Sequence, residues 1–142
     1  MLKSIRETIR LIVIAIRYFY LTKIKKMDIA KSARISVGTH LDKVNPRGIH
    51  IGEESYTASG AFIFTHDYCR NIHLDTFVGK QCFIGANAIV MCGVHIGDNV
   101  VVGSGAVVTK DVPSNCIVAG NPAKIIKEGI KTTKFGQLIK EK

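Results

Sequence analysis

The sequence predicts an all-β fold in which the chain winds into a parallel β-helix of six-residue repeats. An N-terminal helix precedes it, and a short basic C-terminal tail, also predicted to be helical, follows it. From Ile29 onward, a branched aliphatic residue recurs at every sixth position, often followed by Gly, with a small or β-branched residue four positions later. The chain has no Trp, 13 Gly and 7% aromatic residues, and a core of Ile, Val and Ala suits strands better than a helical bundle.

The first predicted unit is a basic amphipathic helical arm over residues 1–28. Its large apolar residues recur at helical spacing, at Ile5, Ile9, Ile12, Ile16 and Phe19. Arginines lie on another side of this helix, and the apolar run is too short and too charged for a transmembrane span. Two interpretations stay open. In the first, the helix packs on the rest of the protein or on a partner subunit. In the second, residues 1–26 contact anionic lipid at a membrane surface.

The second predicted unit is the repeat domain, residues 29–123. Its longest unbroken run covers residues 78–113 and reads VGKQCF, IGANAI, VMCGVH, IGDNVV, VGSGAV, VTKDVP. Large side chains fill the interior of such a coil, and Gly or Asn tolerates the backbone of its corners. Three six-residue repeats form one triangular coil of roughly 18 residues. A β-sandwich would need hairpins at irregular spacing, which this run does not provide.

The repeat register breaks at two places. Ile63 and Val78 are 15 residues apart rather than 12 or 18, which predicts a loop over residues 67–77 outside the prism. Leu41 and Ile51 are 10 residues apart, which predicts a smaller excursion. Insertions into a repeat scaffold collect where function sits, so these two excursions are the first places to look for a site.

Charge is concentrated at the two ends of the chain. The net charge is +9, of which residues 1–34 contribute +7 and the tail, residues 124–142, contributes +4, while the body between them sums to −2. This distribution favours an anionic surface or ligand near the ends. The body carries no nucleic-acid-binding motif, so no nucleic-acid partner is expected.

The cysteines and the start of the chain bear on the compartment. Cys69, Cys82, Cys92 and Cys116 show no CxxC spacing, so no metal site is expected from them. No secretory signal peptide is recognised, because arginines interrupt the first apolar run. The thiols are therefore expected to be reduced and the protein cytoplasmic, at the inner face of the membrane if the arm binds lipid.

The stretch from Ile84 to Lys124, IGANAIVMCGVHIGDNVVVGSGAVVTKDVPSNCIVAGNPAK, resembles the hexapeptide-repeat acetyltransferases. The resemblance covers about residues 29–127 and is strongest to the branch that contains maltose, galactoside and polysaccharide O-acetyltransferases. It implies a left-handed parallel β-helix, a hand that the repeat spacing alone does not give. It also implies a homotrimer with each active site between two subunits, and acetyl-CoA as co-substrate.

His66, in IFTHD, matches the catalytic His of that family and stands where the repeat register fails. A sugar hydroxyl is a poor nucleophile at neutral pH, and a neutral imidazole can take its proton as it attacks the thioester. No covalent enzyme intermediate is then needed. Cys69 could serve as the nucleophile of a two-step mechanism, but nothing near it in the sequence marks it as activated.

Further binding residues follow from the same resemblance. Pantetheine would run along the coils near Gly85–Ala86 and Gly103–Ser104. Thr109 and Lys110 would meet the nucleotide end, and basic groups suit its phosphates. Residues flanking the adenosine phosphates would be Pro122, Lys124 and Lys127.

The acceptor side is less defined by the sequence. Asp67 is expected either to orient His66 or to contact the acceptor. Asn45 is the nearest Asn to the region where the family carries an acceptor-orienting Asn, which has no clear match here. The leading acceptor segment of the maltose type is absent, replaced by the basic arm. A nucleotide sugar or a lipid-linked glycan intermediate is therefore a hypothesis beside a free sugar.

Three other functions remain open alongside a glycan O-acetyltransferase. The first is an antibiotic-inactivating (xenobiotic) acetyltransferase. The second is a non-catalytic β-helix scaffold subunit, which retention of His66, Lys110 and Lys124 argues against. The third is a metal lyase of the carbonic anhydrase type, which needs three converging histidines. The spacing of His66, His73 and His95 does not bring them obviously to one site.

Overall fold

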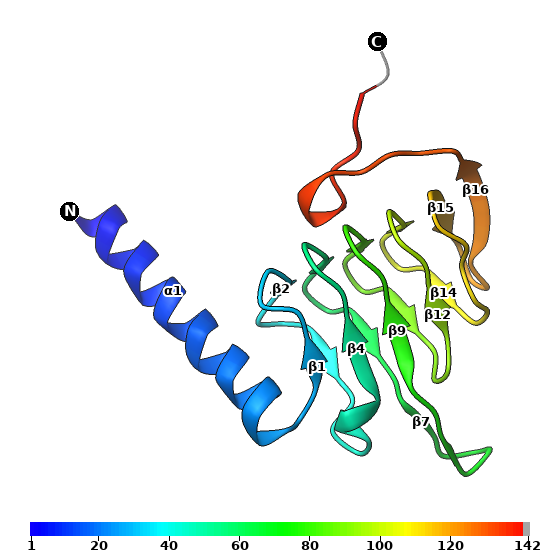
Figure 1. Ribbon diagram of the computed structural model, residues 1–142, viewed down its shortest axis with the longest axis horizontal. Coiled ribbons are helices and arrows are strands. Elements are labelled where there is room, and N and C mark those ends of the chain that lie inside the picture. The colour runs from blue at the N-terminus through cyan, green and yellow to red at the C-terminus, as the bar shows by residue number, and fades with distance from the viewer. Residues whose placement is uncertain (141–142) are drawn as a thin grey trace.

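The computed structural model describes residues 1–140, in which an N-terminal helix leads into a prism of short parallel strands (Figure 1). Helix α1 spans Leu2–Phe19 and continues as a π-helical turn over Tyr20–Ile24. The prism has three faces, and each of the first four coils contributes one strand to each face in turn. This is the left-handed parallel β-helix that the sequence and its resemblance predict.

Face 1 contains four parallel strands: β1 (Asp28–Ile29), β4 (Ile49–Ile51), β9 (Thr76–Val78) and β12 (His95–Ile96). Face 2 contains five parallel strands and one antiparallel strand: β2 (Arg34–Ile35), β5 (Tyr56–Thr57), β10 (Phe83–Ile84), β13 (Val101–Val102), β15 (Cys116–Ala119) and the antiparallel β16 (Lys124–Glu128). Face 3 contains β3 (His40–Leu41), β6 (Phe62–Ile63), β11 (Ile89–Val90) and β14 (Val107–Val108).

The register of each face matches the six-residue repeat. On face 3, Leu41 pairs with Ile63, Ile63 with Val90, and Val90 with Val108, so the first repeat position stacks on itself from coil to coil. These side chains are buried, and so are the small residues at the fifth repeat position, such as Ala88 and Ala106, which stand four positions after Ile84 and Val102. The interior is a column of branched aliphatic and small residues that buries apolar surface along the whole prism.

The corners between strands are tight turns that use left-handed backbone. Non-glycine residues with positive φ lie at Glu54, Gln81, Asn87, Asn99 and Asn115, and glycines hold the same conformation in other turns. Gly85 has a different reason to be glycine. A Cβ there would lie 2.6 Å from both the Val102 oxygen and the Ser104 nitrogen of the next coil, so a larger residue would push two coils apart.

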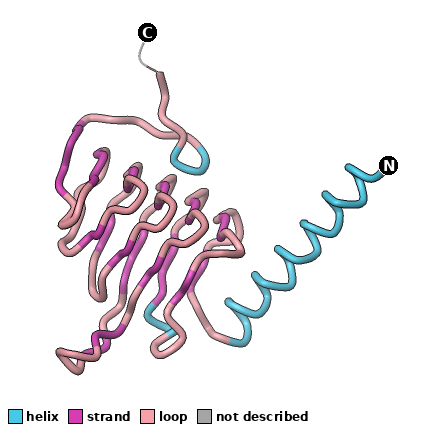
Figure 2. The backbone as a smooth tube through the Cα atoms, turned by 180° about the vertical axis from the view of Figure 1, so that it is seen from behind, coloured by secondary structure: helices cyan, strands magenta, loops and turns pink. Residues whose placement is uncertain are grey.

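The backbone of the arm diverges from the prism toward its N-terminus and comes close to the prism toward its C-terminal end (Figure 2). Leu21 is buried, and Tyr18 donates a hydrogen bond to the Ile29 oxygen at 3.0 Å. Earlier in α1 no residue is buried. None of the helices within residues 1–140 is long and apolar enough to cross a membrane.

The prediction of a helical tail is wrong. Residues 124–128 form β16, which pairs antiparallel with β15, and the chain then runs back along the prism to a short 3₁₀ turn at Lys134–Gly136 (Figure 1). Phe135 packs on face 2, where the Arg34 guanidinium lies 4.1 Å from its ring centre. The tail is held by the last strand edge of face 2 and by aromatic contacts, which a helix could not use in the same way.

Candidate active site

Both breaks in the register fall at one corner of the prism, the corner that follows face 3. The first excursion leaves β3 after Leu41 and contains a 3₁₀ turn at Pro46–Gly48. The second leaves β6 after Ile63 and forms the antiparallel hairpin of β7 (His66–Asp67) and β8 (Ile72–His73). Because Leu41 and Ile63 are paired neighbours, the two excursions lie on adjacent coils.

His66 is held by a residue of the first excursion, Asp42. The Asp42 Oδ2 atom accepts a hydrogen bond from His66 Nδ1, and it also accepts the backbone N–H groups of Thr65 at 2.9 Å and His66 at 3.1 Å. The other oxygen, Oδ1, accepts the Val44 N–H at 2.9 Å. The side chain of Asp42 is 2% exposed and that of His66 is 27% exposed, so a buried carboxylate orients a ring that reaches solvent.

The electrostatics of this pair fix the tautomer of the imidazole. Burial raises the pKa of Asp42, but the hydrogen bonds from Thr65, His66 and Val44 outweigh it and hold that pKa below its ordinary value. An ionised carboxylate only accepts hydrogen bonds, so Nδ1 of His66 carries the proton. The free Nε2 lone pair is then available to take a proton from a nucleophile.

Asp67 and Asn45, the two residues predicted to contact the acceptor substrate, form hydrogen bonds within the protein. Asp67 accepts the Arg70 Nε–H at 2.6 Å and the Arg70 backbone N–H at 3.1 Å, which lowers the pKa of Asp67 and closes the hairpin turn. The expectation that Asp67 orients His66 is therefore corrected, since Asp42 is the residue bonded to the ring. The side-chain amide of Asn45 donates a hydrogen bond to the backbone oxygen of Thr65 at 3.2 Å, and the backbone oxygen of Asn45 accepts one from the Thr65 hydroxyl at 2.6 Å. Thr65 is the residue before His66.

The residues predicted to hold CoA lie along both edges of face 3. Gly85–Ala86 and Gly103–Ser104 are stacked turns at the corner before this face, where the Gly105 N–H donates to the Ala86 oxygen at 2.8 Å. Thr109 and Lys110 follow β14 at the corner of His66. Pro122 shortly precedes β16 and Lys124 is its first residue, and the Ala123 N–H donates to the Val107 oxygen at 2.8 Å.

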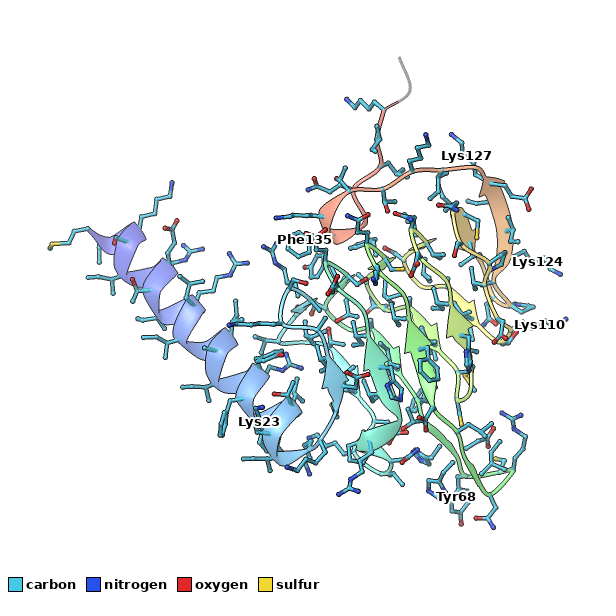
Figure 3. All side chains as sticks on the ribbon, in the orientation of Figure 1. Lys23, Tyr68, Lys110, Lys124, Lys127 and Phe135 are labelled. Carbon is cyan, nitrogen blue, oxygen red and sulfur yellow. The ribbon has the colours of Figure 1, made fainter. Side chains whose placement is uncertain are left out.

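Figure 3 shows how the labelled side chains lie relative to one another. Lys110 and Lys124 lie at the end of the prism that carries β15 and β16, Lys127 projects from β16, and Tyr68 marks the tip of the hairpin (Figure 3). Within one chain, His66 and these lysines are separated by the intervening coils. An extended ligand would have to run along the prism to meet both.

The cysteines divide into one exposed and three buried thiols. Cys69 lies in the hairpin turn and is exposed, whereas Cys82, Cys92 and Cys116 are buried. Burial raises the pKa of the Cys82 thiol to about 11, so this thiol stays protonated and unreactive near neutral pH. Burial also raises the pKa of Cys116.

The remaining histidines do not assemble around His66. His73 faces His66 across the hairpin with ring centres 6.3 Å apart, and His95 packs beside Phe77 on face 1. Within residues 1–140, no group of three or more His, Cys, Asp or Glu side chains is placed to hold a metal ion.

Comparison with known proteins finds relatives of the same architecture. Residues 76–110 match the family model described as the hexapeptide repeat of succinyl-transferase. The protein YvoF of Bacillus subtilis (strain 168) is 32% identical over 103 residues, covering 71% of this chain and 60% of YvoF. A chloramphenicol acetyltransferase of Agrobacterium fabrum is 43% identical over 68 residues, covering 48% of this chain and 32% of that enzyme.

Among solved structures, the maltose O-acetyltransferase of Clostridium difficile 630 superposes with a TM-score of 0.55 at 28% identity, covering 71% of this chain and 68% of that one. This chain thus spans 60% or less of the two sequence relatives. The matched repeat, the prism and these similarities show that the chain has homologues among the hexapeptide-repeat acetyltransferases.

Proposed function

We propose that this protein transfers an acetyl group from acetyl-CoA to a hydroxyl group of a sugar or glycan precursor, as a homotrimer and without a covalent enzyme intermediate. The observation that carries the proposal is the bond between the buried Asp42 carboxylate and the ring of His66. It leaves Nε2 as a base at the surface of the corner where the register breaks. The similarity to a maltose O-acetyltransferase supports a sugar as the acceptor.

The proposed reaction balances with His66 as its only acid–base group. The acceptor hydroxyl gives its proton to Nε2 while its oxygen attacks the thioester carbonyl carbon. The tetrahedral intermediate then collapses, the C–S bond breaks, and the imidazolium returns the proton to the leaving CoA sulfur. Asp42 stabilises the imidazolium that forms between these steps, because it keeps a negative charge against the ring.

The experiment is a measurement of free CoA released from acetyl-CoA across sugars, nucleotide sugars and chloramphenicol-like drugs, for the wild type, His66→Ala and Cys69→Ser. We expect His66→Ala to lose at least about 10²-fold, the scale of a general base, while Cys69→Ser keeps its activity. Loss in Cys69→Ser alone would instead indicate a two-step mechanism. No turnover and no CoA binding would favour the scaffold alternative.

The second candidate is acetylation of a xenobiotic such as an antibiotic. It is favoured by the 43% identity to a chloramphenicol acetyltransferase, although that match covers 48% of this chain. The same panel of acceptors separates the two candidate functions. If the second is correct, a drug acceptor gives faster CoA release than any sugar. His66 has the same role in both.

A further inference from the structure

A groove of about 550 Å³ lies between the end of the arm and the outside of face 3, and it reaches the Asp42 of the proposed site. Its walls come from the arm on one side and from β3 and β6 on the other. Phe64 lines the groove and also meets the His66 ring edge-on, with ring centres 6.4 Å apart. A molecule in the groove would therefore lie beside the Asp42–His66 pair.

The rim of this groove is cationic. Arg17 and Lys25 line it from the arm, and Lys43 lines it from the excursion that carries Asp42. Within the described part of the chain, none of these three cations forms an ion pair. The only carboxylate that lines the groove, Asp42, is already bonded to His66.

Arg17 is fixed in place rather than free in solvent. Its guanidinium donates to the Ser36 oxygen and, at 2.9 Å, to the Thr39 oxygen. Desolvation at this partly buried position lowers the pKa of Arg17, which is the effect of a cation removed from water without an anion beside it. A pre-positioned guanidinium of this kind suits the oxygens of a phosphate.

The floor of the groove is aromatic. His40 stacks on Phe62 with ring centres 4.3 Å apart and an interplanar angle of 11°, and Phe62 stacks on Phe64 at 5.6 Å. Small-molecule sites combine such apolar and aromatic walls with a few placed polar groups. The floor leads toward His66, and two of the three cations, Arg17 and Lys25, lie on the side of the arm.

We infer that the acceptor carries a phosphate or diphosphate, which binds Arg17, Lys25 and Lys43 while its sugar lies on the aromatic floor with a hydroxyl at His66. The inference rests on the proposed function and narrows its substrate class. Two sources share this chemistry, a soluble nucleotide sugar and a sugar linked through diphosphate to a lipid. A free neutral sugar would leave all three cations unpaired.

The test compares acceptors that differ only in the phosphate: galactose and glucose, their 1-phosphates, their uridine diphosphate forms, and the same sugars on a polyprenyl diphosphate in detergent micelles. We expect kcat/KM to be at least about 10-fold higher for phosphorylated acceptors, the scale of a charge-assisted contact. Better turnover of the micellar acceptor would identify the lipid source, and better turnover of the uridine diphosphate form the soluble one. Equal rates for a sugar and its phosphorylated forms would overturn the inference.

A matched set of variants assigns the effect to the groove. The double variant Lys25→Gln/Lys43→Gln should lower kcat/KM for phosphorylated acceptors by about 10-fold or more, with the KM for acetyl-CoA unchanged. Lys31→Gln is the control, because Lys31 is exposed on the first coil and does not line the groove. Equal losses in the control and the double variant, or a loss confined to the KM for acetyl-CoA, would contradict the inference.

A binding measurement separates this inference from the proposed function. Calorimetry of UDP-galactose and UDP-glucose with the His66→Ala variant requires no turnover. Binding that depends on Lys25 and Lys43, in a protein whose wild type transfers no acetyl group, would refute the proposed function and retain the groove as a phosphate site. No binding of either nucleotide sugar, together with no preference for the polyprenyl diphosphate acceptor over the free sugar, would overturn the inference.

Discussion

Asp42 organises the candidate site through one carboxylate that accepts four hydrogen bonds. Three come from backbone N–H groups and one from the His66 ring. The residue therefore anchors both excursions as well as the base. An Asn at this position would keep the shape but lose at least one acceptor, because its amide nitrogen would face an N–H group.

His50 forms a second charged cluster, on face 1. Its Nδ1 and Nε2 atoms lie 2.8 Å from carboxylate oxygens of Asp28 and Asp75, and its ring stacks on Phe77. Burial lowers the pKa of His50, but hydrogen bonds to the two carboxylates outweigh it and raise that pKa above its ordinary value. The protonated ring therefore stabilises the folded state.

A raised pKa makes this contribution depend on pH. The stabilisation by His50 is fully present below the pKa of a histidine in the unfolded chain, about 6.5. It is lost as the pH rises through the pKa of His50 in the folded state. The partners are 76% and 54% exposed, so we expect about 1 kcal/mol or less. Urea unfolding of the wild type and His50→Gln should show a larger difference in unfolding free energy at about pH 6 than at about pH 8.5. The same difference at both pH values would disprove this assignment.

At the scale of elements, the arm exposes an apolar stripe. Ile9, Ile12, Ile16 and Phe19 are each more than half exposed, and Arg6 and Arg10 lie on another side of the helix. The charge matches anionic lipid, and such a stripe buries itself at the headgroup boundary. The arm therefore retains the two interpretations of the sequence, lipid contact or contact with another subunit, and the charge favours lipid.

Vesicle sedimentation tests the lipid interpretation. Deleting residues 1–26 would also remove the buried Leu21, so the sharper variant is Ile9→Asp/Ile12→Asp, which leaves the contacts of Arg17 and Tyr18 in place. We expect this variant to lose its binding to anionic vesicles and to keep its acetyl-transfer activity toward a soluble acceptor. Unchanged vesicle binding would rule out the stripe as the membrane contact, and loss of the assembled oligomer would favour contact with another subunit.

The tail shows where the sequence misled. The basic tail is predicted to be helical, but Lys124–Glu128 pairs with β15 and the Thr132 hydroxyl donates to the Gln81 oxygen at 2.7 Å. Gly136 packs so closely on Phe83 that a Cβ there would lie 2.5 Å from the Cβ of that residue. These are contacts with coils far away in the sequence, which local propensity does not encode.

The site could be predicted in part for a related reason. The sequence predicts His66 through its resemblance to the family's catalytic His and its place where the register fails, and it predicts the buried repeat positions through their spacing. Asp42 was missed because it lies 24 residues before His66, and one Asp in LDKVNP carries no motif. A signal was nevertheless present. Leu41 and Ile63 are equivalent on successive coils, so the residues that follow them had to be neighbours.

For the whole molecule, the candidate residues lie on both edges of face 3. The turns at Gly85 and Gly103 are at one edge, while His66 and Lys110 are at the other. If a second protomer packs against this face, one CoA molecule can contact the Gly85 and Gly103 turns of one chain and His66 of its neighbour. That arrangement is the physical basis for the homotrimer in the proposed function.

The measurement that tests the central claim most directly is a kinetic cycle of the wild type, Asp42→Asn, His66→Ala and the double variant, with acetyl-CoA and the best acceptor. We expect kcat/KM to fall at least about 10-fold for Asp42→Asn and at least about 10²-fold for His66→Ala. The double variant should be no worse than His66→Ala, because the two residues act as one unit. Thermal unfolding of each variant controls for folding. An active His66→Ala, or independent losses that multiply in the double variant, would contradict the Asp42–His66 mechanism.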